Sequence, residues 1–185
     1  MKDNILFINA CVRPQSRTAE LAWHLLNRLD GEITGVHLPT EGFSPLCHHD
    51  IEKRALHDFI GKEFEYAGQF SKADIIVIAA PFWDLSFPAV LKIYLENITV
   101  SGITFEYSEE GCPVGKCKAK KLYYITTAGG YIGHNNFGFD YVKALAQNFY
   151  GIDDVCFYSA EGLDIFGADV TSIMEEAKER ISNLS

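Results

Sequence analysis

The stretch Asn4-Ile-Leu-Phe-Ile-Asn-Ala-Cys-Val-Arg-Pro-Gln-Ser-Arg-Thr-Ala-Glu20 decides the fold of this 185-residue chain. It begins as an apolar run, continues as a short polar loop and ends as the start of a helix. Such a strand–helix junction presents unpaired backbone N–H groups and the positive end of the helix dipole. The loop adds the hydroxyls of Ser16 and Thr18 and the guanidinium groups of Arg13 and Arg17, which suit a phosphate group. The stretch therefore predicts an anion site, with phosphate as the expected anion.

The composition is that of an ordinary globular protein, with 48% hydrophobic and 22% charged residues. A chain of this length can bury a substantial core, so we expect one domain over residues 1–185. The net charge of −9 argues against nucleic acid or an anionic membrane surface as a partner. No apolar run approaches a membrane span or a signal-peptide core. The five cysteines then predict reduced thiols and a cytoplasmic location.

Apolar runs and helical patterns alternate along the rest of the chain. Further apolar runs cover residues 33–38, 75–80, 122–127 and 155–160. Helical patterns cover residues 17–29, 50–70, 88–100, 137–150 and 168–184. This alternation predicts an α/β fold with three layers, a doubly wound parallel sheet of five strands between helices. In this length we expect the flavodoxin-like strand order 2-1-3-4-5. Glycines and a proline predict an excursion at about 101–120, before the fourth strand.

Three loops are expected to meet beyond the carboxyl ends of the strands, at the point where the strand order reverses. They cover residues 10–18, 81–87 and 128–136. The second loop is rich in large aromatic side chains, which are costly on a surface unless they cover a flat group or pack on a neighbour. The third contains Gly129 and Gly130, which either form a tight turn or let the backbone approach a ligand closely.

Together the loops predict a ligand with a phosphate at one end and a flat, acceptor-rich ring at the other. Flavin mononucleotide (FMN) has this form. A dinucleotide is disfavoured because no G-x-G-x-x-G fingerprint follows the first strand.

Four segments resemble the family of FMN-dependent azoreductases and NAD(P)H:quinone oxidoreductases. They are P-F-W-D-L-S-F-P-A-V-L-K-I-Y-L-E-N at 81–97, G-I-T-F-E-Y-S-E-E-G at 102–111, T-T-A-G-G at 126–130 and I-D-D-V-C-F-Y-S-A-E-G-L at 152–163. The resemblance implies a flavodoxin-like fold, non-covalent FMN and a homodimer with active sites at the subunit interface. It also implies two-electron transfer from NADH or NADPH through the flavin to quinones, azo compounds or related aromatic acceptors. If donor and acceptor stack in turn on the same face of the flavin, the kinetics are expected to be ping-pong.

The resemblance also assigns site residues by position. The phosphate would be held by Ser16, Arg17 and Thr18, the ribityl chain and ring by Pro81, Phe82, Trp83 and Asp84, and the pyrimidine edge by Thr127, Ala128, Gly129 and Gly130. The family often has serine at the position of Ala10, so Arg13 is a candidate substitute contact. Tyr131 and His134 are similar, with a different spacing, to a tyrosine and a histidine near the flavin of mammalian quinone reductases. The alternative for His134 is a surface histidine without a catalytic role.

Two other functions are compatible with parts of the sequence. Cys11 to Thr18 matches the C-x5-R-[ST] loop of cysteine-dependent phosphatases, with Cys11 as nucleophile and Arg17 as phosphate clamp. Against it, Pro14 removes a backbone donor and the chain has no Asp-Pro pair to supply a general acid. A flavodoxin-type electron carrier is the second alternative, although such carriers usually lack the excursion at 101–120.

No metal site is expected. Cys47-His48-His49-Asp50 has ligand-type residues, but neighbouring residues rarely bind one ion together, and we expect a solvated loop there. Cys112 and Cys117 lack the second pair that a zinc site needs, so we expect free thiols.

Overall fold

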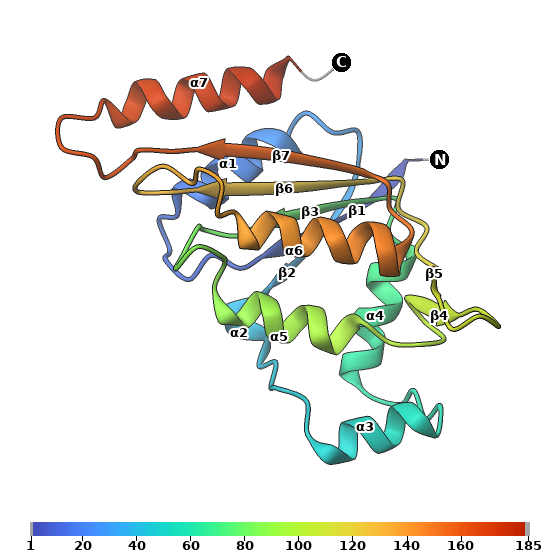
Figure 1. Ribbon diagram of the computed structural model, residues 1–185. Coiled ribbons are helices and arrows are strands. Elements are labelled where there is room, and N and C mark those ends of the chain that lie inside the picture. The colour runs from blue at the N-terminus through green and yellow to red at the C-terminus, as the bar shows by residue number, and fades with distance from the viewer. Residues whose placement is uncertain (1, 184–185) are drawn as a thin grey trace.

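The computed structural model describes residues 2–183 and contains a central parallel sheet. Its strands are β1 (Asp3–Asn9), β2 (Gly31–His37), β3 (Ile75–Ala79), β6 (Lys121–Thr127) and β7 (Asp154–Ala160). Their order in space is β2-β1-β3-β6-β7 (Figure 1), which confirms the predicted order 2-1-3-4-5. All five strands point the same way, so their carboxyl ends form one edge of the sheet and their amino ends the other.

Helices cover both faces of the sheet, which confirms the three-layer prediction (Figure 1). One face packs against α1 (Arg17–Leu26) and α7 (Val170–Ser182), and the other against α4 (Lys62–Lys72), α5 (Ala89–Ile98) and α6 (Phe137–Leu145). Side chains alternate along a strand, so Phe7 faces the first pair of helices and Ile8 the second group. The unbroken apolar run of β3 follows from burial on both faces.

The prediction of one helix over residues 50–70 is wrong. The segment forms two helices, α3 (His48–Ala55) and α4 (Lys62–Lys72). Between them His57 has φ +53° and Gly61 has φ +143°, and neither conformation continues a right-handed helix. A short helix α2 (Leu38–Glu41) follows β2, and α6 continues into a π-helical turn, η1 (Ala146–Tyr150). Helix α7 ends at Ser182, and residue 184 of the predicted last helix lies outside the described residues.

The segment 101–120 contains a hairpin of β4 (Phe105–Tyr107) and β5 (Pro113–Gly115), which pair antiparallel beside the main sheet. It packs closely against the end of η1: a Cβ added to Gly115 would lie 2.2 Å from the backbone nitrogen of Gly151. Cys112 is exposed and Cys117 half-buried, and both are free thiols, as predicted. Burial raises the pKa of the Cys117 thiol to about 12.

Residues Cys47 to Asp50 begin helix α3 and do not form the loop that the sequence predicts. The Asp50 carboxylate accepts a hydrogen bond from the Cys47 backbone N–H at 2.7 Å, and this capping bond explains why the helix starts there. No group of metal-ligating side chains is arranged to hold an ion within residues 2–183. Over the same range, no helix has the length and apolar character that crossing a membrane requires.

Candidate functional site

The start of helix α1 presents several hydrogen-bond donors. Ser16 caps the helix, its hydroxyl accepting a hydrogen bond from the Ala19 N–H at 3.3 Å. Among the described residues, none accepts a hydrogen bond from the backbone N–H groups of Arg17 and Thr18. The buried Thr18 hydroxyl lies 2.6 Å from the Thr127 hydroxyl and joins α1 to the end of β6. This end of the site is therefore a donor-rich pocket of the kind that binds phosphate esters.

A cavity of about 320 Å³ lies at this point, within the roughly 300–1,000 Å³ range of small-molecule sites. It is lined by residues of four loops or strand ends: Val12, Arg13, Gln15, Ser16, Arg17, Thr18, Pro81, Phe82, Trp83, Thr127, Ala128, Gly129, Leu163 and Asp164. Ten of the twelve residues predicted to bind the cofactor are among them. The other two, Asp84 and Gly130, each follow a lining residue in the chain but do not line the cavity.

The aromatic wall is held by a tight turn. The Trp83 N–H donates to the Ser86 carbonyl at 3.0 Å, and the Ser86 N–H donates to the Trp83 carbonyl at 2.8 Å. The two residues between them, Asp84 and Leu85, have φ of +50° and +66°, as in a type I′ turn. This left-handed conformation costs about 1–2 kcal/mol for a residue with a side chain. The turn fixes the position of Trp83, which is 40% exposed at the rim of the cavity.

The third wall continues the sheet beyond β6 and β7. The Leu163 N–H donates to the Ala128 carbonyl at 3.2 Å, and the Asp164 N–H donates to the Gly129 carbonyl at 2.9 Å. The N–H groups of Gly129 and Gly130 have no acceptor among residues 2–183. This wall therefore offers backbone donors to a ligand.

Four lining residues are not among those predicted from the sequence: Val12, Gln15, Leu163 and Asp164. Val12 and Gln15 lie inside the predicted phosphate loop, so they could have been predicted from their position in it. Leu163 and Asp164 follow β7, and the strand order alone indicates that the loop after this strand adjoins the loop after β6. The carboxylate Oδ1 of Asp164 lies 3.3 Å from Arg17 Nη1.

Tyr131 and His134 do not line this cavity. Tyr131 is 78% exposed and lines a second, open hollow of about 560 Å³ between the loop after β7 and helix α7. His134 is exposed on the loop before α6. The structure thus brings neither candidate catalytic side chain to the phosphate pocket.

Cys11 is buried, which contradicts the phosphatase alternative. It is 2% exposed, and its thiol faces the Ala79 carbonyl at 3.8 Å, within the core. Burial raises the pKa of this thiol, whereas a phosphatase nucleophile needs a lowered pKa. It also lines none of the cavity next to Arg17.

The fold and the cavity together define a flavodoxin-like α/β protein with a phosphate pocket at its first strand–helix junction. The family model Flavodoxin_2, described as having a flavodoxin-like fold, matches residues 3–184. An FMN-dependent NADH:quinone oxidoreductase 2 from Clostridium acetobutylicum is 38% identical to the chain, over 95% of this chain and 96% of that protein. The chain belongs to this flavodoxin-like family, and the resemblance to its quinone oxidoreductases and azoreductases is confirmed.

Two solved structures have the same fold. An azoreductase from Bacillus anthracis superposes with a TM-score of 0.82 and 25% identity, covering 97% of each chain. An FMN-dependent NADH-azoreductase from the same organism, in complex with FMN, superposes with a TM-score of 0.77 and 23% identity, covering 97% of this chain and 98% of the other.

Proposed function

We propose that the protein is an FMN-dependent oxidoreductase that transfers a hydride from NADH or NADPH to quinones, azo compounds or related aromatic acceptors. The observation that carries the proposal is the cavity at the carboxyl edge of the sheet. It combines phosphate donors, an aromatic wall and free backbone N–H groups in one site. Bound FMN supplies the redox chemistry, so the protein need only bind, orient and shield.

The donor set at α1 fits the phosphate of FMN. The free N–H groups of Arg17 and Thr18, the positive end of the helix dipole and the guanidinium groups of Arg13 and Arg17 all favour an anion. Ser16 caps the helix by accepting a hydrogen bond from the Ala19 N–H, so the N–H groups of Arg17 and Thr18 stay free at its start. Because the chain carries a net charge of −9, this local positive set is what makes binding of an anion favourable.

The remaining walls fit the other end of the cofactor. Pro81, Phe82 and Trp83 offer flat apolar surface for a ring, with Asp84 next to them on the turn. Thr127, Ala128 and Gly129 also line the cavity, and Gly130 follows them in the chain. The N–H groups of the two glycines are proposed to donate to the polar edge of the ring and to stabilise negative charge that develops there.

We propose that the electron donor and the acceptor bind in turn at the same place beside Trp83, which gives a ping-pong mechanism. Trp83 is 40% exposed although it lines the cavity, so a planar molecule can reach it from solvent. Phe82 and Trp83 would then shape the acceptor site without taking part in the bond changes.

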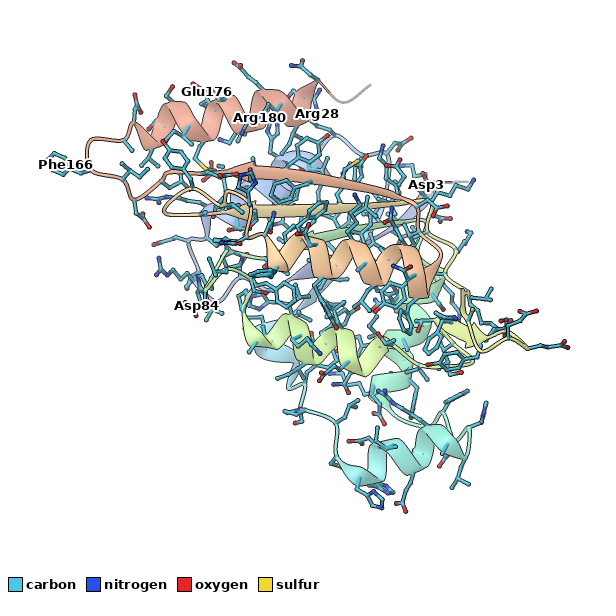
Figure 2. All side chains as sticks on the ribbon, in the orientation of Figure 1. Asp3, Arg28, Asp84, Phe166, Glu176 and Arg180 are labelled. Carbon is cyan, nitrogen blue, oxygen red and sulfur yellow. The ribbon has the colours of Figure 1, made fainter. Side chains whose placement is uncertain are left out.

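We further propose a homodimer. Large apolar side chains are exposed on the segments that follow the carboxyl ends of the strands: Val12, Leu85, Tyr131, Phe137, Ile165 and Phe166. Phe166 is fully exposed and points away from the fold at the end of the loop before α7 (Figure 2). A second subunit would cover such surface. Light scattering of the purified protein tests this, with twice the mass of the 20.7 kDa chain expected.

Reduction of the bound flavin by nicotinamides tests the proposed function. Protein saturated with FMN is mixed anaerobically with NADH or NADPH, and the visible absorbance of the flavin is followed. Rapid bleaching, followed by recovery on adding a quinone or an azo dye, is expected. Steady-state rates should give parallel double-reciprocal lines. A protein that binds no flavin would contradict the proposal, and flavin that is inert to both nicotinamides would indicate an electron carrier.

A further inference from the structure

Asp164 places a carboxylate inside the proposed phosphate pocket. It follows β7 on the loop that leads to α7, and its Oδ1 lies 3.3 Å from Arg17 Nη1. Its backbone is fixed by the hydrogen bond to the Gly129 carbonyl at 2.9 Å. A Cβ added to Gly129 would lie 2.4 Å from Asp164 Oδ2. The carboxylate thus occupies space that is open because residue 129 is glycine.

This carboxylate has the wrong charge for its surroundings. The other polar side chains at this end of the cavity are the guanidinium groups of Arg13 and Arg17, the neutral amide of Gln15 and hydroxyls, beside free backbone N–H groups. A carboxylate at neutral pH only accepts hydrogen bonds, and it repels a phosphate. It also accepts a hydrogen bond from Nη1 of the Arg17 guanidinium at 3.3 Å, and a guanidinium is well suited to bind two phosphate oxygens at once.

Another anion can replace the Asp164 carboxylate at Arg17, because the ion pair is open to solvent. The side chains of Arg17 and Asp164 are 44% and 76% exposed. Ion pairs of this kind are weak in water, and a dianionic phosphate that also receives backbone N–H groups binds an arginine more strongly.

We propose that Asp164 is a specificity-determining residue that competes with the phosphate of FMN for Arg17 and so weakens cofactor binding. This inference rests on the proposed function. A bound phosphate would accept hydrogen bonds from Arg17 in place of the Asp164 carboxylate, which is already 76% exposed to solvent. Asp164 thereby lowers the affinity for FMN but not for riboflavin, which has the same ring and no phosphate. The ratio of the two affinities is therefore smaller than it would be without this carboxylate.

Flavin titrations of the flavin-free protein test the competition. FMN and riboflavin are each titrated into the wild type and Asp164→Asn, and binding is read from quenching of flavin fluorescence. Asparagine keeps the shape of the side chain and removes its charge. We expect FMN to bind Asp164→Asn about threefold to tenfold more tightly than the wild type, and riboflavin to bind both within about twofold.

The matched control is Asp153→Asn, which removes the same charge elsewhere. Asp153 is exposed and lies next to the amino end of β7, at the opposite edge of the sheet. The seven residues of β7 span about 23 Å, more than twice the screening length of roughly 8–10 Å in physiological salt. We expect this variant to bind both flavins as the wild type does.

A double-mutant cycle separates competition for Arg17 from general repulsion. In the Arg17→Gln background, competition predicts that Asp164→Asn no longer strengthens FMN binding, whereas general repulsion predicts an undiminished gain. Asp164→Ser, which also lacks the charge, replaces Asp164→Asn if that variant does not fold.

The outcomes distinguish the two proposals. If the wild type binds FMN and Asp164→Asn binds it no more tightly, the competition is contradicted and the proposed function stands. An equal gain for riboflavin, or a gain that persists in Arg17→Gln, also contradicts it. If neither the wild type nor any variant binds FMN, the proposed function itself fails.

Discussion

The two edges of the sheet differ in whether their polar groups have hydrogen-bond partners within the protein. At the amino edge, Asp74 accepts a hydrogen bond from the Asn4 N–H at 2.9 Å and pairs with Lys118 at 2.6 Å. At the carboxyl edge, the N–H groups of Arg17 and Thr18 have no acceptor among the described residues. Figure 2 shows the contrast in position, with Asp3 at one end of the sheet and Asp84 and Phe166 at the other.

The backbone differs in the same sense. The amino side contains the hairpin β4–β5, where glycine backbones pack directly on each other. The carboxyl side contains two consecutive left-handed residues with side chains, Asp84 and Leu85, at the rim of the cavity. Strain of this kind persists where the surrounding structure enforces it, and it clusters at functional sites. The difference teaches that the two edges have separate roles. The amino edge stabilises the fold, whereas the carboxyl edge has unpaired donors, aromatic surface and a strained turn where a ligand can bind.

The largest expected effect lies on the amino side. Gly115→Ala puts a Cβ 2.2 Å from the Gly151 nitrogen, so backbone must move, and we expect about 3 kcal/mol less free energy of unfolding. Urea denaturation measures it. Gly35→Ala on β2 is the control, since nothing lies within 4 Å of its added Cβ. The folded Gly115→Ala protein should keep its FMN affinity, and a loss of affinity as large as the loss of stability would break the comparison.

On the carboxyl edge, Arg17→Gln should have the opposite effect: it should lower the FMN affinity and leave the stability of the fold nearly unchanged. Losing a charged hydrogen bond to the phosphate should weaken FMN binding by about 10-fold to 100-fold, with little change in the thermal midpoint. Fluorescence titration measures the affinity. Lys72→Gln at the exposed end of α4 removes the same charge away from the cavity and is the control. An equal loss of riboflavin affinity would show that Arg17 does not act on the phosphate.

A smaller effect concerns the strained turn. Leu85→Gly should be more stable than Leu85→Ala by about 1 kcal/mol, because both remove the side chain but alanine keeps the cost of φ +66°. Denaturant unfolding of the two variants measures the difference. Alanine as stable as glycine would mean that the turn carries no strain.

The smallest effect is the pH dependence of the amino edge. Lys118 and the Asn4 N–H hold the pKa of Asp74 below its ordinary value of 3.8. The folded carboxylate therefore binds a proton less readily than the unfolded one. Its contribution is complete above the ordinary pKa and is lost as the pH falls through the folded value.

Asp74→Asn should accordingly reduce the acid dependence of the denaturation midpoint below about pH 4. Asp153→Asn is the control, and FMN affinity at neutral pH should not change in either variant. An acid profile identical to that of the wild type would show that Asp74 contributes nothing to the amino edge.

The sequence predicts the fold well because its signal is local. Each buried strand is a short apolar run, and the runs locate all five strands of the main sheet to within two residues. The break within 50–70 includes His57, whose left-handed conformation no hydrophobic pattern reveals, and Gly61, which the sequence does show as a residue that weakens a helix.

The candidate site likewise has a part that local sequence predicts and a part that depends on tertiary contacts. The phosphate loop follows from one continuous stretch, and most of its lining residues were predicted from it. Asp164 was missed because its partner, Arg17, is 147 residues away and a single loop aspartate has no pattern. The exposure of Tyr131 likewise follows from the hydrogen bonds between residues 128–130 and 162–164 beyond the strands. These are tertiary contacts, which a local sequence pattern does not reveal.

A crystal structure of the protein saturated with FMN tests the central claim most directly. We predict density for the phosphate at the N-terminus of α1, within hydrogen-bond distance of the Arg17 and Thr18 N–H groups, with the ring against Phe82 and Trp83. Density for FMN at any other place, or a cavity at the carboxyl edge that stays free of flavin at saturating concentration, would contradict it.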